Sequence, residues 1–305
     1  MALASPSVLE EDATSRGAAI GGDGEAVIGV ITPANLLSFG RRLARSVANW
    51  PRVLARLSLS SAGIRAGGDI RTLLRNGVAL VAPPSRPAWW PIFEMFAEDV
   101  YRLRGEDLAG LDLGEGDVVL DVGAHIGSSA VLFSRRWPAA TIVAVEPNPT
   151  TFEYLRRNIE ENGVRARLRN EAVGAHDGKI TLFGTDDASC EASTSLPKPG
   201  TSVEVPVTAF ERLMDEAPGR VRVVKLDCEG AEHEVFAAST PELWTEVDVL
   251  LLEYHRTADP ASEWPAVEDR VRRLGFETRW HMPFDWYPGL GMAGFRRLSG
   301  AGTRT

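Results

Sequence analysis

The chain has 305 residues, enough for one large α/β domain with additions or for two domains at most. Its net charge of −9 disfavours a nucleic-acid binder, because phosphate contacts need basic surfaces. Its 2 cysteines provide neither a disulfide framework nor a zinc cluster, and no apolar run reaches the ~18 residues of a membrane span. The acidic N-terminus also lacks the charge pattern of a signal peptide, so we expect a reduced, soluble protein of the cytoplasm.

The N-terminal part of the chain divides into two regions. Residues 1–30 are rich in Ala, Gly, Ser and acids without periodicity, which is typical of disorder. Residues 31–110 are expected to form a helical extension and lid, which starts with an arginine-rich amphipathic helix from Thr32 to Leu59. Such a helix packs on its own domain more often than on a membrane, and a second subunit is another possible partner, which would make a homodimer.

The rest of the extension follows in short segments. Residues 69–81 suggest a strand pair around Asn76-Gly77, residues 83–91 a proline-rich loop, and residues 92–103 a further helix. The third region, residues 111–305, is expected to be the ligand-binding domain.

That domain opens on Asp117-Val-Val-Leu-Asp-Val-Gly-Ala-His-Ile-Gly127. A buried strand ends at Asp121, the chain turns through Gly123 and Gly127, and an apolar-periodic segment, 128–137, follows. Strand, glycine turn and helix form the first half of a nucleotide-binding βαβ unit.

The turn favours a ligand without phosphates. A dinucleotide site wants Gly-x-Gly-x-x-Gly, because the pyrophosphate lies almost on the backbone. Here the third motif position is His125, which would fill that space, and Asp121 suits a cation. S-adenosylmethionine, whose ammonium and sulfonium are positive, fits both features. We therefore take Asp121, Gly123, His125 and Gly127 as candidates for binding this cofactor.

Two further strand ends extend this site. The strand from Thr141 ends at Glu146, 23 residues after Gly123, where doubly wound folds place a carboxylate on ribose hydroxyls. Asn148 lies in the turn that follows and is included in the cofactor site. After a third strand, 164–168, Glu171 and Ala172 are candidates for reading adenine.

A second cluster of acids follows the strand Val221–Leu226. Asp227 and Glu229 lie in the turn after it, at the sheet edge where open α/β folds bind ligands, whereas Glu232 and Glu234 fit a helix N-terminus. The next strand, 247–252, ends at Glu253-Tyr-His255. Histidine suits proton transfer near neutral pH, so His255 is a functional candidate.

These segments resemble the FkbM family of S-adenosylmethionine-dependent methyltransferases. The resemblance rests on four segments in order: Asp121-Val-Gly-Ala-His-Ile-Gly127, Glu146-Pro147, Lys225-Leu-Asp-Cys-Glu-Gly-Ala-Glu232 and Glu253-Tyr-His255. Family members usually have asparagine where His125 stands. The resemblance implies a Rossmann-like class I methyltransferase fold: a mostly parallel seven-stranded sheet with an antiparallel strand at its edge, completed by residues 276–280 and 291–297. It also implies O-methylation of a small molecule, often a sugar or a polyketide-type hydroxyl.

The expected mechanism is attack of an acceptor hydroxyl on the sulfonium methyl. His255 is the first choice for the base and Asp227 the second, with Glu229 beside them, while Trp286 and Tyr287 are candidates for stacking on the acceptor. No metal is expected, although Asp227 and Glu253 end neighbouring strands and offer Mg²⁺ two carboxylates. Two other functions stay open: an NAD-dependent oxidoreductase, and a non-catalytic S-adenosylmethionine-binding subunit.

Overall fold

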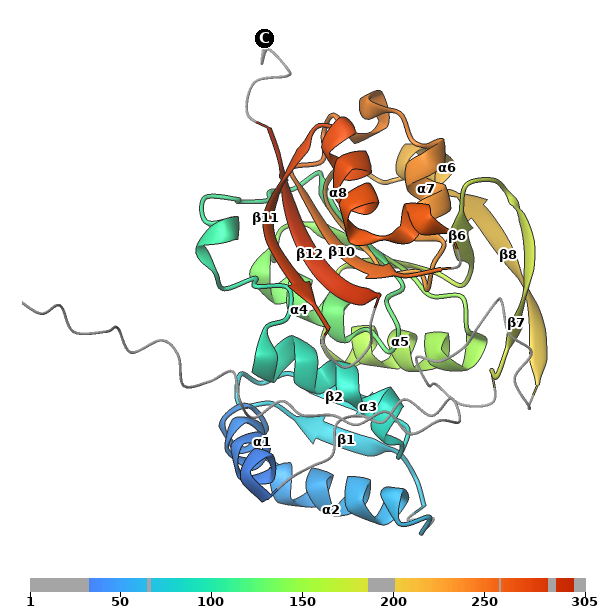
Figure 1. The fold of residues 1–305 in the computed structure, drawn as a ribbon. Coiled ribbons are helices and arrows are strands. Elements are labelled where there is room, and N and C mark those ends of the chain that lie inside the picture. The colour runs from blue at the N-terminus through green and yellow to red at the C-terminus, as the bar shows by residue number, and fades with distance from the viewer. Residues whose placement is uncertain (1–32, 65–66, 186–200, 258, 285–288, 299–305) are drawn as a thin grey trace, which may run out of the picture.

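The computed structural model describes residues 33–64, 67–185, 201–257, 259–284 and 289–298 (Figure 1). The disorder expected for residues 1–30 therefore concerns residues outside those described. In the described ranges, no helix combines the length and the apolar character needed to cross a bilayer.

A seven-stranded sheet forms the centre of the molecule, with strand order β11-β12-β10-β9-β3-β4-β5. Only β12 runs antiparallel to its neighbours β10 and β11, whereas the other pairings are parallel. The predicted fold class is thus confirmed, and the antiparallel strand lies one place in from the edge. The strands are β3 (Asp117–Val122), β4 (Thr141–Val145), β5 (Ala166–Arg169), β9 (Arg220–Leu226), β10 (Val249–His255), β11 (Phe276–Pro283) and β12 (Leu290–Arg297).

Helices cover both faces of the sheet (Figure 1), which is why its central strands are apolar on both sides. Val118 and Leu120 of β3 lie in the core of one face, and Val119 lies in the core of the other. The first face carries α6 (Phe210–Asp215), α7 (Glu232–Ala238) and α8 (Trp264–Arg273). The second carries α4 (Ser128–Arg136), α5 (Pro149–Glu161) and the N-terminal extension.

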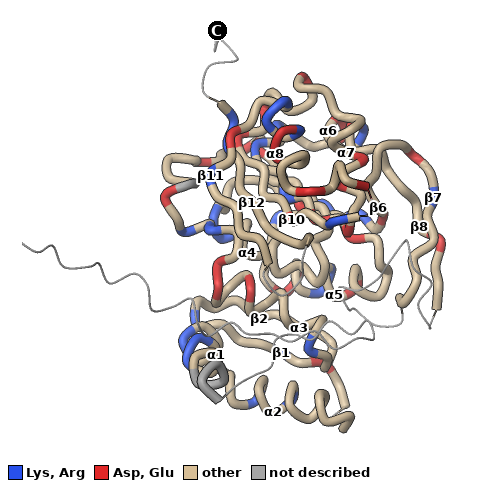
Figure 2. Tube along the Cα trace, viewed as in Figure 1, with Lys and Arg blue, Asp and Glu red and all other residues tan. Residues whose placement is uncertain are grey.

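The extension starts with two helices where the sequence predicted one. Helix α1 (Pro33–Ser46) and helix α2 (Trp50–Ser61) are separated at Val47, which forms an isolated bridge with Leu74. Pro51 in the first turn of α2 favours a new helix start at this point. The basic residues of α1 are visible in Figure 2, whereas its Leu43 is fully buried in the core of the chain itself.

For the next segments, one prediction is correct, one is wrong and one is correct in part. The strand pair exists as β1 (Ile70–Leu73) and β2 (Ala79–Ala82), with Gly77 in the left-handed region at φ 86°. The loop expected over 83–91 is instead mostly helix α3 (Arg86–Phe93), because Ser85 caps its N-terminus. The helix expected over 92–103 is correct only as far as residue 98: the end of α3 continues into a single π-helical turn, η1 (Glu94–Glu98), which ends at Asp99 with φ 51°.

Asn158 of α5 and Asn162, the residue that follows this helix, dock the extension onto the domain. The Asn158 amide accepts the Val81 N–H at 2.7 Å and donates to the Val81 carbonyl at 2.9 Å and the Ile126 carbonyl at 2.8 Å. One turn later, Asn162 makes the same pair of bonds with the backbone of Ala79. The two side chains thus pair with the backbone N–H and C=O groups along one edge of β2. A buried strand edge needs such hydrogen-bond partners.

Shorter elements complete the described chain. A three-stranded sheet, ordered β6-β8-β7, lies beside the domain in Figure 1. It consists of β6 (Ala172–Gly174), β7 (Gly178–Phe183) and β8 (Ser202–Ala209). The 3₁₀ turns are η2 (Glu106–Leu108), η3 (Pro241–Trp244) and η4 (Pro260–Ser262).

Candidate active site

The predicted site residues come from the carboxyl ends of adjacent parallel strands, which share one edge of the sheet. Asp121 and Lys225 are register partners on β3 and β9, and Leu226 pairs with Leu252 on β10. The turns that follow these strands therefore meet at the edge where open α/β sheets bind ligands.

Asp121, a candidate for binding the cofactor, has a fully buried side chain. Its Oδ2 accepts the Ser129 hydroxyl at 2.7 Å, and its Oδ1 lies 3.5 Å from Lys225 Nζ. Burial raises the pKa of this carboxyl, while Lys225 and Ser129 act in the opposite direction. Asp121 thus contacts the first turn of α4 and the neighbouring strand.

The turn after β3 needs the left-handed backbone at Gly123, His125 and Gly127, with φ of 74°, 50° and 88°. A Cβ on Gly123 would lie 1.8 Å from the Asp227 carbonyl oxygen, and one on Gly127 would lie 2.8 Å from Leu155. Gly123 is thus required by close packing against backbone as well as by conformation, whereas Gly127 is required mainly by its left-handed conformation, since the tip of Leu155 can shift. Position 125 tolerates a side chain because His, Asn and Asp adopt left-handed backbone more readily than other residues.

Four backbone N–H groups of this turn, those of Gly123, Ala124, His125 and Gly127, are already used by the protein itself. Gly123 and Ala124 both donate to the Val145 carbonyl, at 3.0 and 2.9 Å, and Gly127 donates to Ala124 at 2.8 Å. The His125 N–H donates to Glu146 Oε2 at 3.0 Å. These are the groups that would cradle a pyrophosphate in a dinucleotide site, so the turn is a poor phosphate site.

Glu146 is fixed through both carboxylate oxygens. Oε2 accepts the His125 N–H, and Oε1 accepts the Asn148 N–H at 2.9 Å. Burial outweighs these two bonds and raises the pKa of Glu146 to about 7. Asn148 itself caps α5 by accepting the Thr150 N–H at 3.0 Å. A residue that the sequence analysis overlooked, Asn170, supports this turn by donating to the carbonyl of Glu146 at 2.8 Å.

The residues expected to read adenine lie next to the third strand end. Ala172 begins β6, and the Glu171 carboxylate forms an ion pair with Arg169, which also pairs with Glu216 at 2.7 Å. The structure therefore gives Glu171 a cationic partner within the chain.

The turn after β9 carries the second cluster. Glu229 and Gly230 both have positive φ, of 55° and 105°, so the turn reverses tightly between Asp227 and α7. Asp227 Oδ2 lies 3.1 Å from the buried Lys225 Nζ. One ligand atom from each of Asp227, Glu229 and His255 lies within 4.8 Å of the other two. The structure thus brings together the three residues expected to be catalytic.

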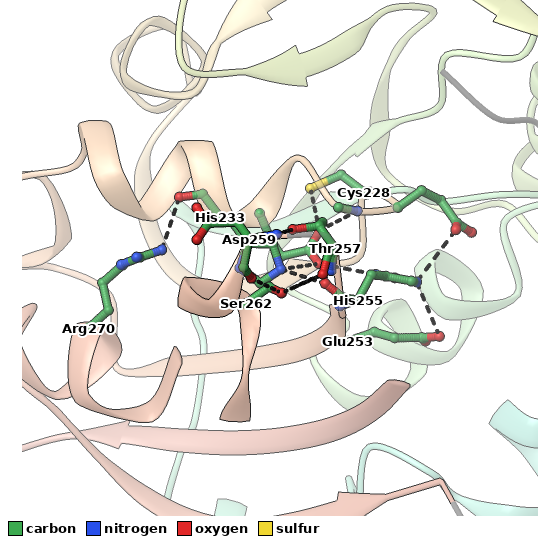
Figure 3. A network of polar contacts seen from close by, with 11 residues as sticks. Cys228, His233, Glu253, His255, Thr257, Asp259, Ser262 and Arg270 are labelled. Atoms are coloured by element: carbon green, nitrogen blue, oxygen red, sulfur yellow. Dashed lines mark hydrogen bonds and ion pairs between the residues drawn. The ribbon is translucent and has the colours of Figure 1, made fainter. Parts of the chain in front are cut away.

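Figure 3 shows His255 beside Glu253. The ring of His255 is held by the buried carboxylate of Glu232. Glu232 Oε1 accepts the His255 backbone N–H at 2.7 Å and lies 3.1 Å from its Nδ1. The other ring nitrogen, Nε2, lies 3.5 Å from Glu229 Oε2 and 3.9 Å from Glu253 Oε1. Glu232 therefore orients the ring so that Nε2 faces the acids of the site.

The charges around His255 favour its protonated form. Burial lowers the pKa of its ring, but the hydrogen bond to Glu232 and the charges of Glu232, Glu229 and Glu253 outweigh burial and raise the pKa to about 10. Burial and then the charge of Asp227 raise the pKa of Glu253 well above its ordinary range. His255 thus carries a proton at neutral pH in the free protein.

Besides Asn170, two further site residues are missing from the set predicted from the sequence. Lys225 and Glu232 are almost completely buried, and each contacts two segments of the site. The sequence does contain a pattern that includes them, since both belong to the Lys225–Glu232 segment on which the family resemblance rests. Glu232, however, was interpreted as a charge at a helix N-terminus. The candidates for acceptor stacking, Trp286 and Tyr287, lie outside the described residues.

Comparison with known proteins identifies the family. The sequence model of the "Methyltransferase FkbM domain" matches residues 121–278, more than half of the chain. Methyltransferase 1 of Beauveria bassiana is 27% identical over 192 residues, which cover 56% of this chain and 76% of that protein.

Two other relatives have more specific names. Hexuronic acid methyltransferase AglP of Haloferax volcanii is 28% identical over 172 residues, covering 56% of this chain and 68% of that protein. The 31-O-demethyl-FK506 methyltransferase FkbM of Streptomyces tacrolimicus is 24% identical over 213 residues, covering 60% and 80%. With the match to the family over its central domain, this chain belongs to the FkbM family of methyltransferases.

Proposed function

We propose that the protein transfers a methyl group from S-adenosylmethionine to a hydroxyl of a small molecule, a sugar or a polyketide-type natural product. The observation that carries the proposal is the contact between two turns at one sheet edge. Asp121 and Glu146 lie beside one turn, 122–127. The other turn carries Asp227 and Glu229, which lie close to His255 at the end of β10.

The donor half of the proposal rests on chemistry at the first turn. S-adenosylmethionine supplies a methyl group on a positively charged sulfur. Glu146 offers a carboxylate that two backbone N–H groups hold in place, as a site for ribose hydroxyls requires. The turn N–H groups at Gly123, Ala124 and His125 are engaged, which disfavours the NAD alternative because a pyrophosphate needs such donors.

The acceptor half rests on His255 and its neighbours. A hydroxyl must lose its proton when its oxygen gains a methyl group, and His255 Nε2 is the atom proposed to receive it. Because this nitrogen is protonated at neutral pH in the free protein, it must first lose that proton. Asp227, whose carboxylate is partly exposed beside it, is the second candidate for the base.

The extension, residues 31–110, is proposed to act as a lid over residues 111–305. Burial and the charge of Asp227 are among the factors that raise the pKa of Glu94 to about 7, so η1 lies within electrostatic reach of the acids. Tyr101 is likewise buried and acted on by Asp227 and Glu253. Both residues come from the extension, which supports its role in excluding water from the acceptor.

The relatives guide the choice of acceptor. The names of two relatives specify a hexuronic acid and an FK506 precursor as their substrates, which makes sugars and polyketides the first classes to test. Calorimetry should detect binding of S-adenosylmethionine and none of NAD. A screen of sugars and polyketide alcohols should then find a product heavier by one methylene unit.

The outcomes separate the remaining functions. Binding of NAD in preference to S-adenosylmethionine would support the oxidoreductase. Donor binding without methyl transfer to any member of the screen would support a non-catalytic subunit. The exposed histidine His176 offers a matched control, since His176→Gln should keep the turnover that His255→Gln loses.

A further inference from the structure

Lys225 occupies an unusual position for a lysine. It lies on β9, opposite Asp121 of β3, and only 2% of its surface is exposed. A buried ammonium is expensive to desolvate and persists only with several partners.

The partners of Lys225 belong to both halves of the site. Its Nζ lies 3.1 Å from Asp227 Oδ2 and 3.2 Å from the Val122 carbonyl, and it also donates to the Gly123 carbonyl. Asp121 Oδ1 is a fourth neighbour at 3.5 Å. The three N–H groups of an ammonium thus match two carbonyls of the turn after β3 and one carboxylate of the turn after β9.

The backbone at this point confirms that the two turns touch. The Asp227 carbonyl oxygen would lie 1.8 Å from a Cβ on Gly123, so only glycine permits the contact. Lys225 Nζ would lie 3.6 Å from the same Cβ. Lysine, glycine and aspartate therefore meet at one place, between the proposed donor turn and the acid turn.

A role as counter-ion for Asp121 alone does not account for these contacts. Asp121 is the most distant of the four partners, and its Oδ2 already accepts the Ser129 hydroxyl. The shorter contacts lead to the carbonyls of the donor turn and to Asp227.

We propose that Lys225 is a positioning residue that holds the turn 122–127 against Asp227, so that the donor turn and the acid offered to the acceptor keep one arrangement. The inference rests on the proposed function, because it assumes that this turn binds the donor.

The test compares the affinities of Asp121→Asn and Asp121→Asn/Lys225→Met, two variants that differ only at Lys225. Lys225→Met alone leaves Asp121 buried without its cation and is expected to lower the melting temperature. Asp121→Asn/Lys225→Met removes both charges and should recover most of that loss. We expect the double variant to bind S-adenosylhomocysteine at least tenfold more weakly than Asp121→Asn, as measured by calorimetry. Lys179→Met, at an exposed lysine of β7, is the matched control and should bind like the wild type.

The results distinguish this inference from the proposed function. Equal affinities of Asp121→Asn and the double variant would overturn the role of Lys225 while the donor assignment stands. Failure of the wild type to bind S-adenosylhomocysteine would overturn the donor assignment, and the role of Lys225 with it.

Hydrogen exchange offers a test in the unmodified protein. S-adenosylhomocysteine should slow exchange of backbone amides in both 122–127 and 226–231, because Lys225 ties the two turns together. Protection confined to the first turn would contradict the proposal even if no Lys225 variant folds.

Discussion

The buried Oε1 of Glu232 contacts His255 twice, accepting its backbone N–H at 2.7 Å and lying 3.1 Å from its Nδ1. The other oxygen of this carboxylate, Oε2, accepts the Gly230 N–H at 2.8 Å. One side chain thus fixes both the turn that carries Glu229 and the ring that faces it. A carboxylate that holds one ring nitrogen of a histidine sets which nitrogen is free for chemistry.

Glu232→Gln should therefore lower methyl transfer by about 10²-fold or more, as expected when an orienting carboxylate is replaced by an amide. The pKa of His255 should also fall, because a neutral amide no longer stabilises the imidazolium. Turnover and an NMR titration of the histidine measure the two effects. Glu234→Gln is the matched control, since Glu234 is exposed in the same helical turn. Equal turnover in both variants would contradict the orienting role.

The pH dependence of turnover tests His255 as the base. Its pKa of about 10 lies above the ordinary value of 6.5, so the neutral form that can accept a proton grows as pH rises. We expect kcat/KM to increase from pH 7 toward pH 10 and to lose this dependence in His255→Gln. A wild-type profile that is flat over this range would exclude His255 and favour Asp227.

The same shift predicts how His255 affects stability. Because its folded pKa is raised, its contribution to the free energy of unfolding is fully present below about pH 6.5 and is lost as pH rises through 10. Denaturant unfolding of the wild type and of His255→Gln at pH 6 and pH 10 should therefore show a smaller difference at the higher pH.

Glu146 should control donor affinity. Its pKa of about 7 means that the carboxylate gains its proton as pH falls through neutrality, which removes a charged acceptor from the proposed ribose site. The affinity for S-adenosylhomocysteine should then weaken below pH 7, as measured by calorimetry. In Glu146→Gln the affinity should be about tenfold weaker or worse and independent of pH in this range, since a bound hydroxyl loses a charged partner. Glu160→Gln, at the exposed end of α5, should behave like the wild type.

The sequence predicts most of the sheet and the residues at its strand ends, because acids after apolar runs are local patterns. Glu146 and Asp227 directly follow strands and His255 ends one, while Asp121 lies one residue before the end of β3. Lys225 and Glu232 belong to the segment on which the family resemblance rests, but the pattern of an acid after an apolar run does not reveal what they do. Their roles depend on partners in distant segments: Lys225 contacts Gly123, and Glu232 contacts His255. Their burial follows from tertiary packing.

The extension was harder to predict because proline is compatible with both a loop and the first turn of a helix. Prolines at 83–91 suggested a loop, but Pro87 lies in the first turn of α3, where the missing N–H costs nothing. Pro91 lies within the same helix, and the chain continues into the π-helical turn η1. Proline count alone does not separate these positions from a loop.

Asn158 should be essential for docking the extension. Asn158→Ala would leave the Val81 N–H, the Val81 carbonyl and the Ile126 carbonyl without their side-chain partner in a buried place. Each buried group left unsatisfied costs about 1–3 kcal/mol, so a loss of several kcal/mol in the free energy of unfolding is expected. Asn162→Ala should cost less, because its bonds to Ala79 are only partly buried. Denaturant unfolding measures both, and a larger loss at Asn162 would contradict this account.

Removal of divalent metal tests whether the acids around His255 bind a catalytic metal ion. Asp227, Glu229 and His255 are close enough to share an ion, and the sequence had suggested Mg²⁺ between Asp227 and Glu253. However, a protonated imidazole has no free lone pair for a metal, and the pKa of His255 is about 10. Glu253 also has a raised pKa, which weakens it as a ligand near neutrality. We therefore expect turnover to be unchanged after dialysis against EDTA and after addition of Mg²⁺. Loss of turnover in EDTA that Mg²⁺ restores, and that Glu229→Gln weakens, would show instead that these carboxylates bind a catalytic ion.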